Sequence, residues 1–251
     1  MLENLAGKAS RARRRLALAK EQAGHAGAAK EIVRLARRAV VIPVSAARDV
    51  AFDWRMGVRT RGEVSHESEL IPRSIGGDPR FYQPIYLGQW RRALATIPVD
   101  RRTATFVDLG AGRGRALILA AEMGFGRVVG VELDERLTDE AAENIRRWRR
   151  RRGSPPGSEQ DVAAVHGDAA AYQFPAGRLV ILLYNPFGAT TMRHVLREVS
   201  DLERASDDQV YVAYFNPVHE SVFAEFPRLV PHARGKGWSV YRLDPGGPAT
   251  R

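Results

Sequence analysis

The chain from residue 103 onward alternates between short apolar runs and longer segments with helical spacing. The apolar runs predict strands at 103–109, 127–133, 162–166, 179–184 and 209–215, strand material around Leu229, and a last strand at 238–243. The segments between them predict helices at 113–123, 135–152 and 191–205, and a short helix after His219. Alternating elements of this kind build an α/β fold with a doubly wound, mostly parallel sheet.

The chain before residue 103 has a different pattern. Residues 1 to about 40 are rich in Ala, Arg, Lys, Glu and Leu, and apolar positions recur at helical spacing between Ile32 and Val40, which predicts helix. Pro43 closes this region, and the many Gly and Pro residues of 45–88 predict loops with short helices. A helix at 89–97 follows. We therefore expect a basic helical extension with lid or substrate-binding residues at 1–88, and an α/β domain at 89–251.

The charge of the chain is concentrated near its beginning. The net charge is +10, and residues 1–61 hold 14 Lys or Arg against five Asp or Glu, an excess of nine. Such a field attracts nucleic acid, an anionic membrane or an acidic protein, although a solvated Arg-rich helical surface would explain it equally well. No cysteine is present, and the histidines form no metal-binding pattern. No apolar run approaches the roughly 18 residues of a membrane span and no secretory signal is evident, so we expect a cytoplasmic location.

The turn after the first predicted strand carries three glycines at alternate positions, Gly110, Gly112 and Gly114. Glycine in a strand-to-helix turn lets backbone N–H groups approach a ligand closely. Glu132 ends the next strand, where a carboxylate can accept both hydroxyls of a ribose. The spacing G-x-G-x-G departs from the dinucleotide fingerprint, and Asp108 beside the turn would repel a pyrophosphate and suit a cationic ligand. The pattern predicts a nucleoside-type cofactor, and the alternative is a purely structural turn.

The stretch from Val107 to Gly114, together with Glu132, resembles the first two motifs of the class I S-adenosylmethionine-dependent methyltransferases. The resemblance implies a seven-stranded sheet closed by an antiparallel pair, and S-adenosyl-L-methionine as the cofactor. It implies that Asp108 acts at the amino end of the cofactor and that Glu132 binds the ribose diol. A strand-end carboxylate that caps the following helix is the alternative for Glu132.

Two further segments extend the cofactor site by resemblance. Asp168 and Ala169 follow the third predicted strand, where the family places an acid against the adenine amino group and a backbone N–H against the ring. A helix N-cap is the alternative role of Asp168. Tyr82-Gln83-Pro84 resembles a Tyr-x-Pro-Thr segment that closes over the methionine part of the cofactor, although Ile85 stands in place of the threonine. Packing of Tyr82 in the core is equally compatible with the sequence.

The residues that end the fourth predicted strand, Asn185-Pro186-Phe187, resemble the Asn-Pro-Pro-Tyr motif of methyltransferases acting on nitrogen, but with a single proline followed by Phe-Gly. The Asn185 side-chain oxygen and the Pro186 carbonyl can accept hydrogen bonds from a target amino group, and Phe187 can stack on a planar substrate or shield a cationic sulfur. A Pro-Gly turn that merely ends a strand is the alternative.

Asn216-Pro217 repeats this pattern after the fifth strand, and His219 beside it is a candidate proton acceptor or a surface residue. Six arginines surround Trp148 at the end of the predicted helix 135–152. They can serve the helix dipole or form a phosphate-binding surface.

The sequence therefore predicts a bacterial methyltransferase that uses S-adenosyl-L-methionine and methylates an amino group on a peptide, protein or natural product. RNA or DNA methylation is the first alternative, supported by the charge, and a non-catalytic cofactor-binding partner is the second. The chain also resembles a group of bacterial methyltransferases that share Phe52-Asp53 and Gly57-Val58-x-Thr60-x-Gly62. The acceptor and the oligomeric state are not predicted.

Overall fold

A computed structural model describes residues 47–61, 85–153, 160–203 and 208–246. The chain divides into two compact units, Met1–Phe52 and Asp53–Arg251, and everything below concerns the second. The expected helical extension over residues 1–40 and the candidate Tyr82 lie outside the described residues.

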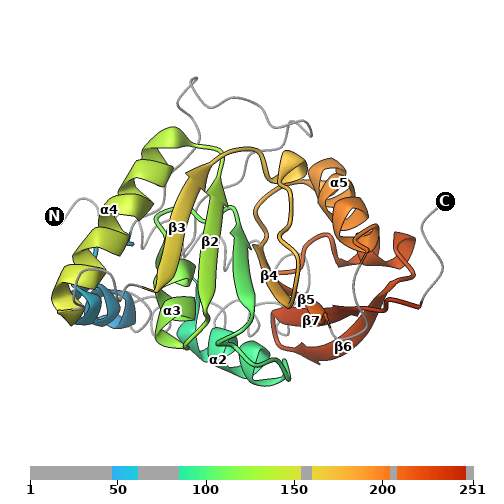
Figure 1. The fold of residues 1–251 in the computed structure, drawn as a ribbon, viewed down its shortest axis with the longest axis horizontal. Coiled ribbons are helices and arrows are strands. Elements are labelled where there is room, and N and C mark those ends of the chain that lie inside the picture. Colours follow the sequence, from blue (N-terminus) through green and yellow to red (C-terminus); the bar gives the residue numbers. More distant parts are fainter. Residues whose placement is uncertain (1–46, 62–84, 154–159, 204–207, 247–251) are drawn as a thin grey trace, which may run out of the picture. The chain divides into compact units, whose positions relative to one another are not determined.

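The second unit contains one seven-stranded sheet with the order β3-β2-β1-β4-β5-β7-β6 (Figure 1). The strands are β1 (Thr105–Leu109), β2 (Arg127–Glu132), β3 (Asp161–His166), β4 (Leu179–Tyr184), β5 (Val210–Phe215), β6 (Leu229–Gly235) and β7 (Trp238–Leu243). The first five strands pair in parallel, and β7 runs antiparallel to both of its neighbours. The α/β fold expected from the sequence, with its closing antiparallel pair, is confirmed.

Helices cover both faces of the sheet because successive residues of a strand point to opposite sides. On one face, Trp90 of α2 (Leu87–Ala95) packs edge-on against Phe106, and Leu117 of α3 (Arg115–Glu122) packs against Gly130. α4 (Glu135–Arg152) lies along β3 and next to α3. The neighbouring residue Val107 points to the other face, where it shares a core with α5 (Ala189–Ser200) and the 3₁₀ helix η2 (Glu220–Glu225).

The elements predicted from residue 89 onward all exist, and the differences concern their ends. β4 and α4 have the predicted bounds, whereas α2 begins two residues earlier than predicted and α5 covers Ala189–Ser200 instead of 191–205. α5 stops early because the buried Arg228 guanidinium donates to the carbonyls of Ser200 and Leu202. A side chain thus satisfies these carbonyls in place of the N–H groups of a further helical turn. A one-turn 3₁₀ helix, η1 (Ala169–Ala171), was not predicted.

The parallel strands bring their carboxyl ends to one edge of the sheet. The glycine turn follows β1 at this edge, Glu132 ends β2, and Asp168 follows β3. Asn185 follows β4 and Asn216 follows β5. In open α/β sheets ligands bind outside this edge, so the fold gathers most of the predicted site residues where a ligand would lie.

Candidate functional site

The glycine turn adopts a conformation that few other residues accept. Gly110, Gly112 and Gly114 all have positive φ, at +87°, +52° and +78°. A Cβ on Gly110 would lie 2.6 Å from the Cβ of Pro186, which real atoms do not tolerate. The turn after β1 therefore packs directly on the turn after β4, and glycine is required both for the backbone angle and for this approach.

Glu132 binds the middle glycine of the turn, Gly112. One carboxylate oxygen, Oε2, accepts a hydrogen bond from the Gly112 N–H at 2.7 Å, and Oε1 accepts one from the Asp134 N–H at 3.0 Å. The N-cap of α4 is Asp134, whose side chain accepts from the Arg136 N–H. A carboxylate has about four acceptor positions, so the half-buried Glu132 keeps capacity for further donors such as hydroxyl groups.

Asp108 is a buried carboxyl group beside this turn, with 3% of its surface exposed. Burial, and secondarily the negative charge of Glu132, raise the pKa of Asp108 to about 8. Its carboxyl group is therefore mostly protonated at neutral pH. A cation placed against it would favour the ionised form, so the site is suited to a positively charged group.

The segment after β3 is held by local hydrogen bonds. The Asp168 side chain accepts from the Ala170 N–H at 2.9 Å and caps η1, and the Gly167 N–H donates to the Glu132 carbonyl at 2.9 Å. The cap is one of the two roles that the sequence allowed for Asp168. Contact of Asp168 and Ala169 with an adenine ring stays a prediction. His166, which the sequence analysis did not select, pairs with Glu132 across β2 and β3, and its Nε2 lies 3.0 Å from the Leu133 carbonyl.

The turn after β4 contains a strained residue with an unsatisfied acceptor. Asn185 has φ +43°, a region that side chains rarely adopt and asparagine tolerates best. Its Oδ1 is buried and has no hydrogen-bond partner within the described part of the chain. An unsatisfied buried acceptor costs roughly 1–3 kcal/mol, which a ligand donor would recover. Pro186 faces the glycine turn, whereas Phe187 is only 6% exposed and packs in the core beneath α5.

The turn after β5 repeats this geometry. Asn216 has φ +49° and follows Phe215, which pairs with Tyr184, so Asn185 and Asn216 occupy equivalent places on neighbouring strands. Asn216 is exposed. The half-buried His219 donates its backbone N–H to the Tyr214 hydroxyl at 3.0 Å and precedes η2. Its role as a proton acceptor stays a prediction.

The arginines at the end of α4 bind groups of the protein itself. Arg146, Arg147 and Arg150 contact Glu143 and lower its pKa to about 2, and Arg152 pairs with Glu122 and lies over Trp148. Arg149 donates to the carbonyls of Gln160 and Val162, and Arg151 donates to that of Arg55. Because Gln160 and Val162 flank the start of β3, these arginines lie at the edge of the sheet opposite the glycine turn.

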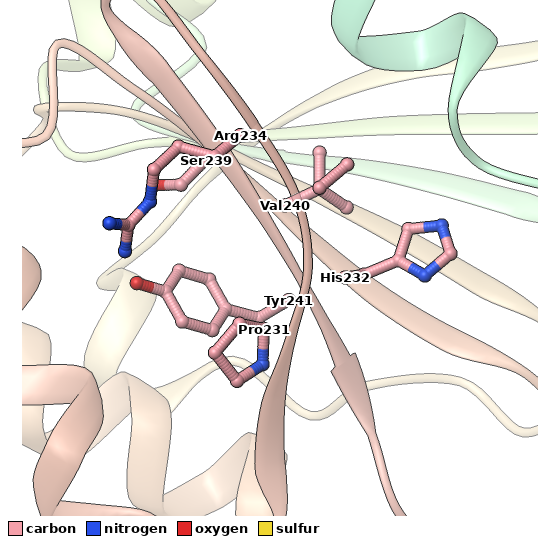
Figure 2. Close-up of a pocket in the computed structure, with 7 residues that line it drawn as sticks. Pro231, His232, Arg234, Ser239, Val240 and Tyr241 are labelled. Carbon is pink, nitrogen blue, oxygen red and sulfur yellow. The ribbon is translucent and has the colours of Figure 1, made fainter.

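A cavity of about 250 Å³ is lined by residues of the paired strands β6 and β7, away from this edge cluster (Figure 2). None of the predicted site residues lines it. Tyr241 and Arg234 extend to the same side in Figure 2, and both contact the Glu220 carboxylate at 3.1 Å. These polar groups satisfy one another, so we assign the cavity no ligand.

Within the described ranges, no group of three or more His, Cys, Asp or Glu residues could hold a metal ion. No helix in those ranges has the length and apolar character needed to cross a membrane.

Three solved structures to which this chain is similar carry methyltransferase names. An RNA methyltransferase from Salinibacter ruber in complex with S-adenosyl-L-homocysteine is 22% identical, with 66% of this chain and 96% of that chain covered and a TM-score of 0.46. Geranyl diphosphate C-methyltransferase from Streptomyces coelicolor A3(2), also bound to S-adenosyl-L-homocysteine, is 15% identical, with coverages of 62% and 78% and a TM-score of 0.45. Ribosomal protein L11 methylase from Lactobacillus delbrueckii subsp. bulgaricus is 18% identical, with coverages of 64% and 88% and a TM-score of 0.42.

No protein-family model matches the chain, and a comparison with curated proteins found no match either. The strand order β3-β2-β1-β4-β5-β7-β6, with β7 antiparallel to both neighbours, is the seven-stranded sheet closed by an antiparallel pair that the resemblance to class I S-adenosylmethionine-dependent methyltransferases implied.

Proposed function

We propose that this chain is an S-adenosyl-L-methionine-dependent methyltransferase that methylates an amino nitrogen of a peptide, protein or natural product. The observation that carries the nitrogen assignment is the buried, unpartnered Oδ1 of Asn185, in a strained turn packed against the glycine turn. A hydrogen-bond acceptor in this place favours an acceptor substrate that carries a hydrogen-bond donor. An amine carries such a donor, and a carbon nucleophile does not.

The residues around the glycine turn fit the cofactor. Glu132 has acceptor capacity for the two ribose hydroxyls, and Asp108 gains a favourable charge partner if the cofactor's ammonium group binds beside it. The three glycines permit the positive φ angles of the turn, and Gly110 and Gly114 permit its close packing on Pro186 and Ala141. We assign the adenine contacts to Asp168 and Ala169, at the end of the next strand.

The bound donor would supply a methyl group on a positively charged sulfur. The task of the protein is to hold the acceptor nitrogen in line with that methyl group. Asn185 Oδ1 and the Pro186 carbonyl would each accept one N–H bond of the acceptor and aim its lone pair at the methyl carbon. Transfer would form the nitrogen–carbon bond and break the sulfur–carbon bond, with the electron pair of the broken bond left on sulfur. The surplus proton leaves to water or to His219.

The alternative of nucleic-acid methylation gains no support from the described arginines. All six around Trp148 have partners within the protein, at the far edge of the sheet from the site. That alternative rests on the charge of residues 1–61, most of which lie outside the described residues.

The acceptor assignment can be tested with Asn185→Gly. Glycine accepts the positive φ of this position, so the variant removes the amide and keeps the backbone. We expect kcat to fall on the order of 100-fold, about 3 kcal/mol, with unchanged affinity for S-adenosyl-L-homocysteine. Asn216→Gly makes the same substitution in the matching turn after β5 and is the control.

The substrate screen should offer labelled cofactor to amine-bearing peptides, proteins and natural products, and to RNA and DNA in parallel. Mass spectrometry of the product locates the new methyl group. Methylation on oxygen or carbon, or wild-type kcat in Asn185→Gly, would refute the nitrogen assignment. Methylation of nucleic acid alone would support the alternative, and binding of cofactor without turnover of any class would favour a non-catalytic partner.

A further inference from the structure

The segment 53–61 consists of the end of a helix and the loop that follows it, and it is built around one buried carboxylate. Asp53 is 5% exposed and Thr60 is fully buried. The Asp53 carboxylate accepts from the Thr60 N–H at 3.0 and 3.1 Å, from the Thr60 hydroxyl at 2.7 Å and from the Arg61 N–H at 3.3 Å. The Val58 N–H donates to the Asp53 carbonyl at 2.9 Å. These bonds give the loop that follows the helical residues 53–56 a defined shape.

The segment lies against α4. The Arg151 side chain donates to the Arg55 carbonyl at 3.0 Å, and its guanidinium lies 5.8 Å from the centre of the Trp54 ring. Gly57 has φ +71°, and a Cβ there would meet the Arg151 side chain at 2.7 Å. The segment therefore begins near the C-terminal end of α4 and continues toward the N-terminal half of that helix.

Asn144 joins the segment to the glycine turn. Its side chain is 2% exposed, and its Oδ1 accepts from the Arg59 N–H at 2.8 Å. Its Nδ2 donates to the Arg59 carbonyl at 3.1 Å and to the Arg113 carbonyl at 3.0 Å. Both amide protons of Asn144 are thus used, one on the segment and one on the residue between Gly112 and Gly114.

The side chain of Arg113 makes a second connection. Its Nε lies 2.7 Å from Glu140 Oε2 on α4, and its guanidinium donates to the Arg61 carbonyl. Gly114 also lies close to α4, because a Cβ there would be 3.1 Å from the Cβ of Ala141. Residues 113 and 114 of the glycine turn are therefore held by α4 and by the segment 53–61, while Glu132 holds Gly112.

We propose that Asn144 is a positioning residue for the cofactor turn, and that the segment 53–61 acts on the cofactor site through it. Three residues in the left-handed region make this turn costly to order, because glycine loses the most backbone freedom on folding. The Glu132 carboxylate would bond both to the Gly112 N–H and to a ligand, so its contact with the turn changes when a ligand binds. The contacts of Arg113 with Asn144 and Glu140 involve no ligand-binding group and stay the same. This inference rests on the proposed function, since it concerns how the same turn is held in shape before S-adenosyl-L-methionine binds.

The test compares Asn144→Ala with Trp148→Phe. Trp148 also lies on α4 and is also buried, and its Nε1 donates to Glu122 at 2.8 Å, away from the turn. Trp148→Phe therefore removes a buried hydrogen bond of the same helix without touching the turn. Asp53→Asn is a second test variant, because it weakens the loop closure of segment 53–61 at nearly constant volume.

Three measurements separate positioning from stability: the Kd of S-adenosyl-L-homocysteine by calorimetry, hydrogen exchange of residues 110–114 without ligand, and the unfolding temperature. For Asn144→Ala we expect about tenfold weaker binding, equal to about 1.4 kcal/mol, faster exchange in 110–114, and unchanged kcat at saturating donor. Asp53→Asn should also weaken binding of S-adenosyl-L-homocysteine and speed hydrogen exchange in 110–114, but by less than Asn144→Ala does. Trp148→Phe should lower the unfolding temperature only.

Wild-type affinity and wild-type exchange at 110–114 in both test variants would overturn the inference. If Asn144→Ala does not fold, Asp53→Asn decides by the same criteria. If the wild-type protein binds no S-adenosyl-L-homocysteine, the proposed function fails, while hydrogen exchange still reports whether Asn144 orders the turn.

Discussion

Replacement of Asp108 by Asn should make the protein more stable and its cofactor site weaker. The pKa of Asp108 is raised from 3.8 to about 8, mainly by burial. Folding therefore opposes ionisation of this carboxyl group. A rise of the pKa from 3.8 to about 8 corresponds to about 6 kcal/mol at most, because a tenfold change in an equilibrium constant is worth about 1.4 kcal/mol.

The pH dependence has a definite sign. The folded protein holds a proton on Asp108 that the unfolded chain releases above pH 3.8. The stability of the wild type relative to Asp108→Asn is thus highest at acid pH and falls as pH rises toward 8, by up to about 1.4 kcal/mol per unit. Above pH 8 both states are ionised and the difference levels off.

Urea unfolding of both proteins at intervals from pH 5 to 8.5 would measure this difference directly. Asn has nearly the shape of Asp, so packing changes little and other titrating groups cancel in the subtraction. Parallel stability curves for the two proteins would refute the assignment of Asp108 as a buried carboxyl group with a raised pKa.

The same residue should bind the ammonium group of the cofactor. Ligand binding near pH 7 should then release a proton from wild-type Asp108, which calorimetry in buffers of different ionisation enthalpy detects. Asp108→Asn should release none there and should bind about tenfold or more weakly, because a charge-assisted hydrogen bond is worth about 1.5–3 kcal/mol. Equal proton release in both proteins would show that another group contacts the cation.

Three further predictions concern the turn and the extension. Wild-type protein should bind S-adenosyl-L-homocysteine in the micromolar range, about −8 kcal/mol, and Glu132→Ala should lose most of that affinity in calorimetry because it also frees the Gly112 N–H. Gly110→Ala should abolish cofactor binding and lower the unfolding temperature, since the new Cβ would meet Pro186 at 2.6 Å; a wild-type Kd would contradict the packing described. Deletion of residues 1–40 should reduce substrate turnover more than cofactor affinity, and equal loss of both would show that these residues belong to the core.

The sequence by itself determined the order and type of the elements in the α/β domain. A continuous apolar run makes β4 a central strand, because only a strand covered on both faces buries consecutive residues, as Leu179 to Leu183 are buried here. The bounds of α4 follow from local chemistry: Asp134 caps its start and Gly153, at φ +64°, ends it. The glycine spacing at 110–114 likewise indicated the turn that the structure contains.

Other features depended on contacts between residues far apart in the chain, which no local pattern encodes. The sequence placed 45–61 among the loops and short helices of an extension, yet Arg59 bonds to Asn144, 85 positions away, and the segment 53–61 lies on α4. The run of arginines around Trp148 was compatible with a phosphate-binding surface until the structure showed a protein partner for each. Phe187 is buried beneath α5, although its motif alone was compatible with an exposed stacking surface. Local propensity sets where a strand ends and a helix begins, but only the packing of the sheet decides which side chains meet there.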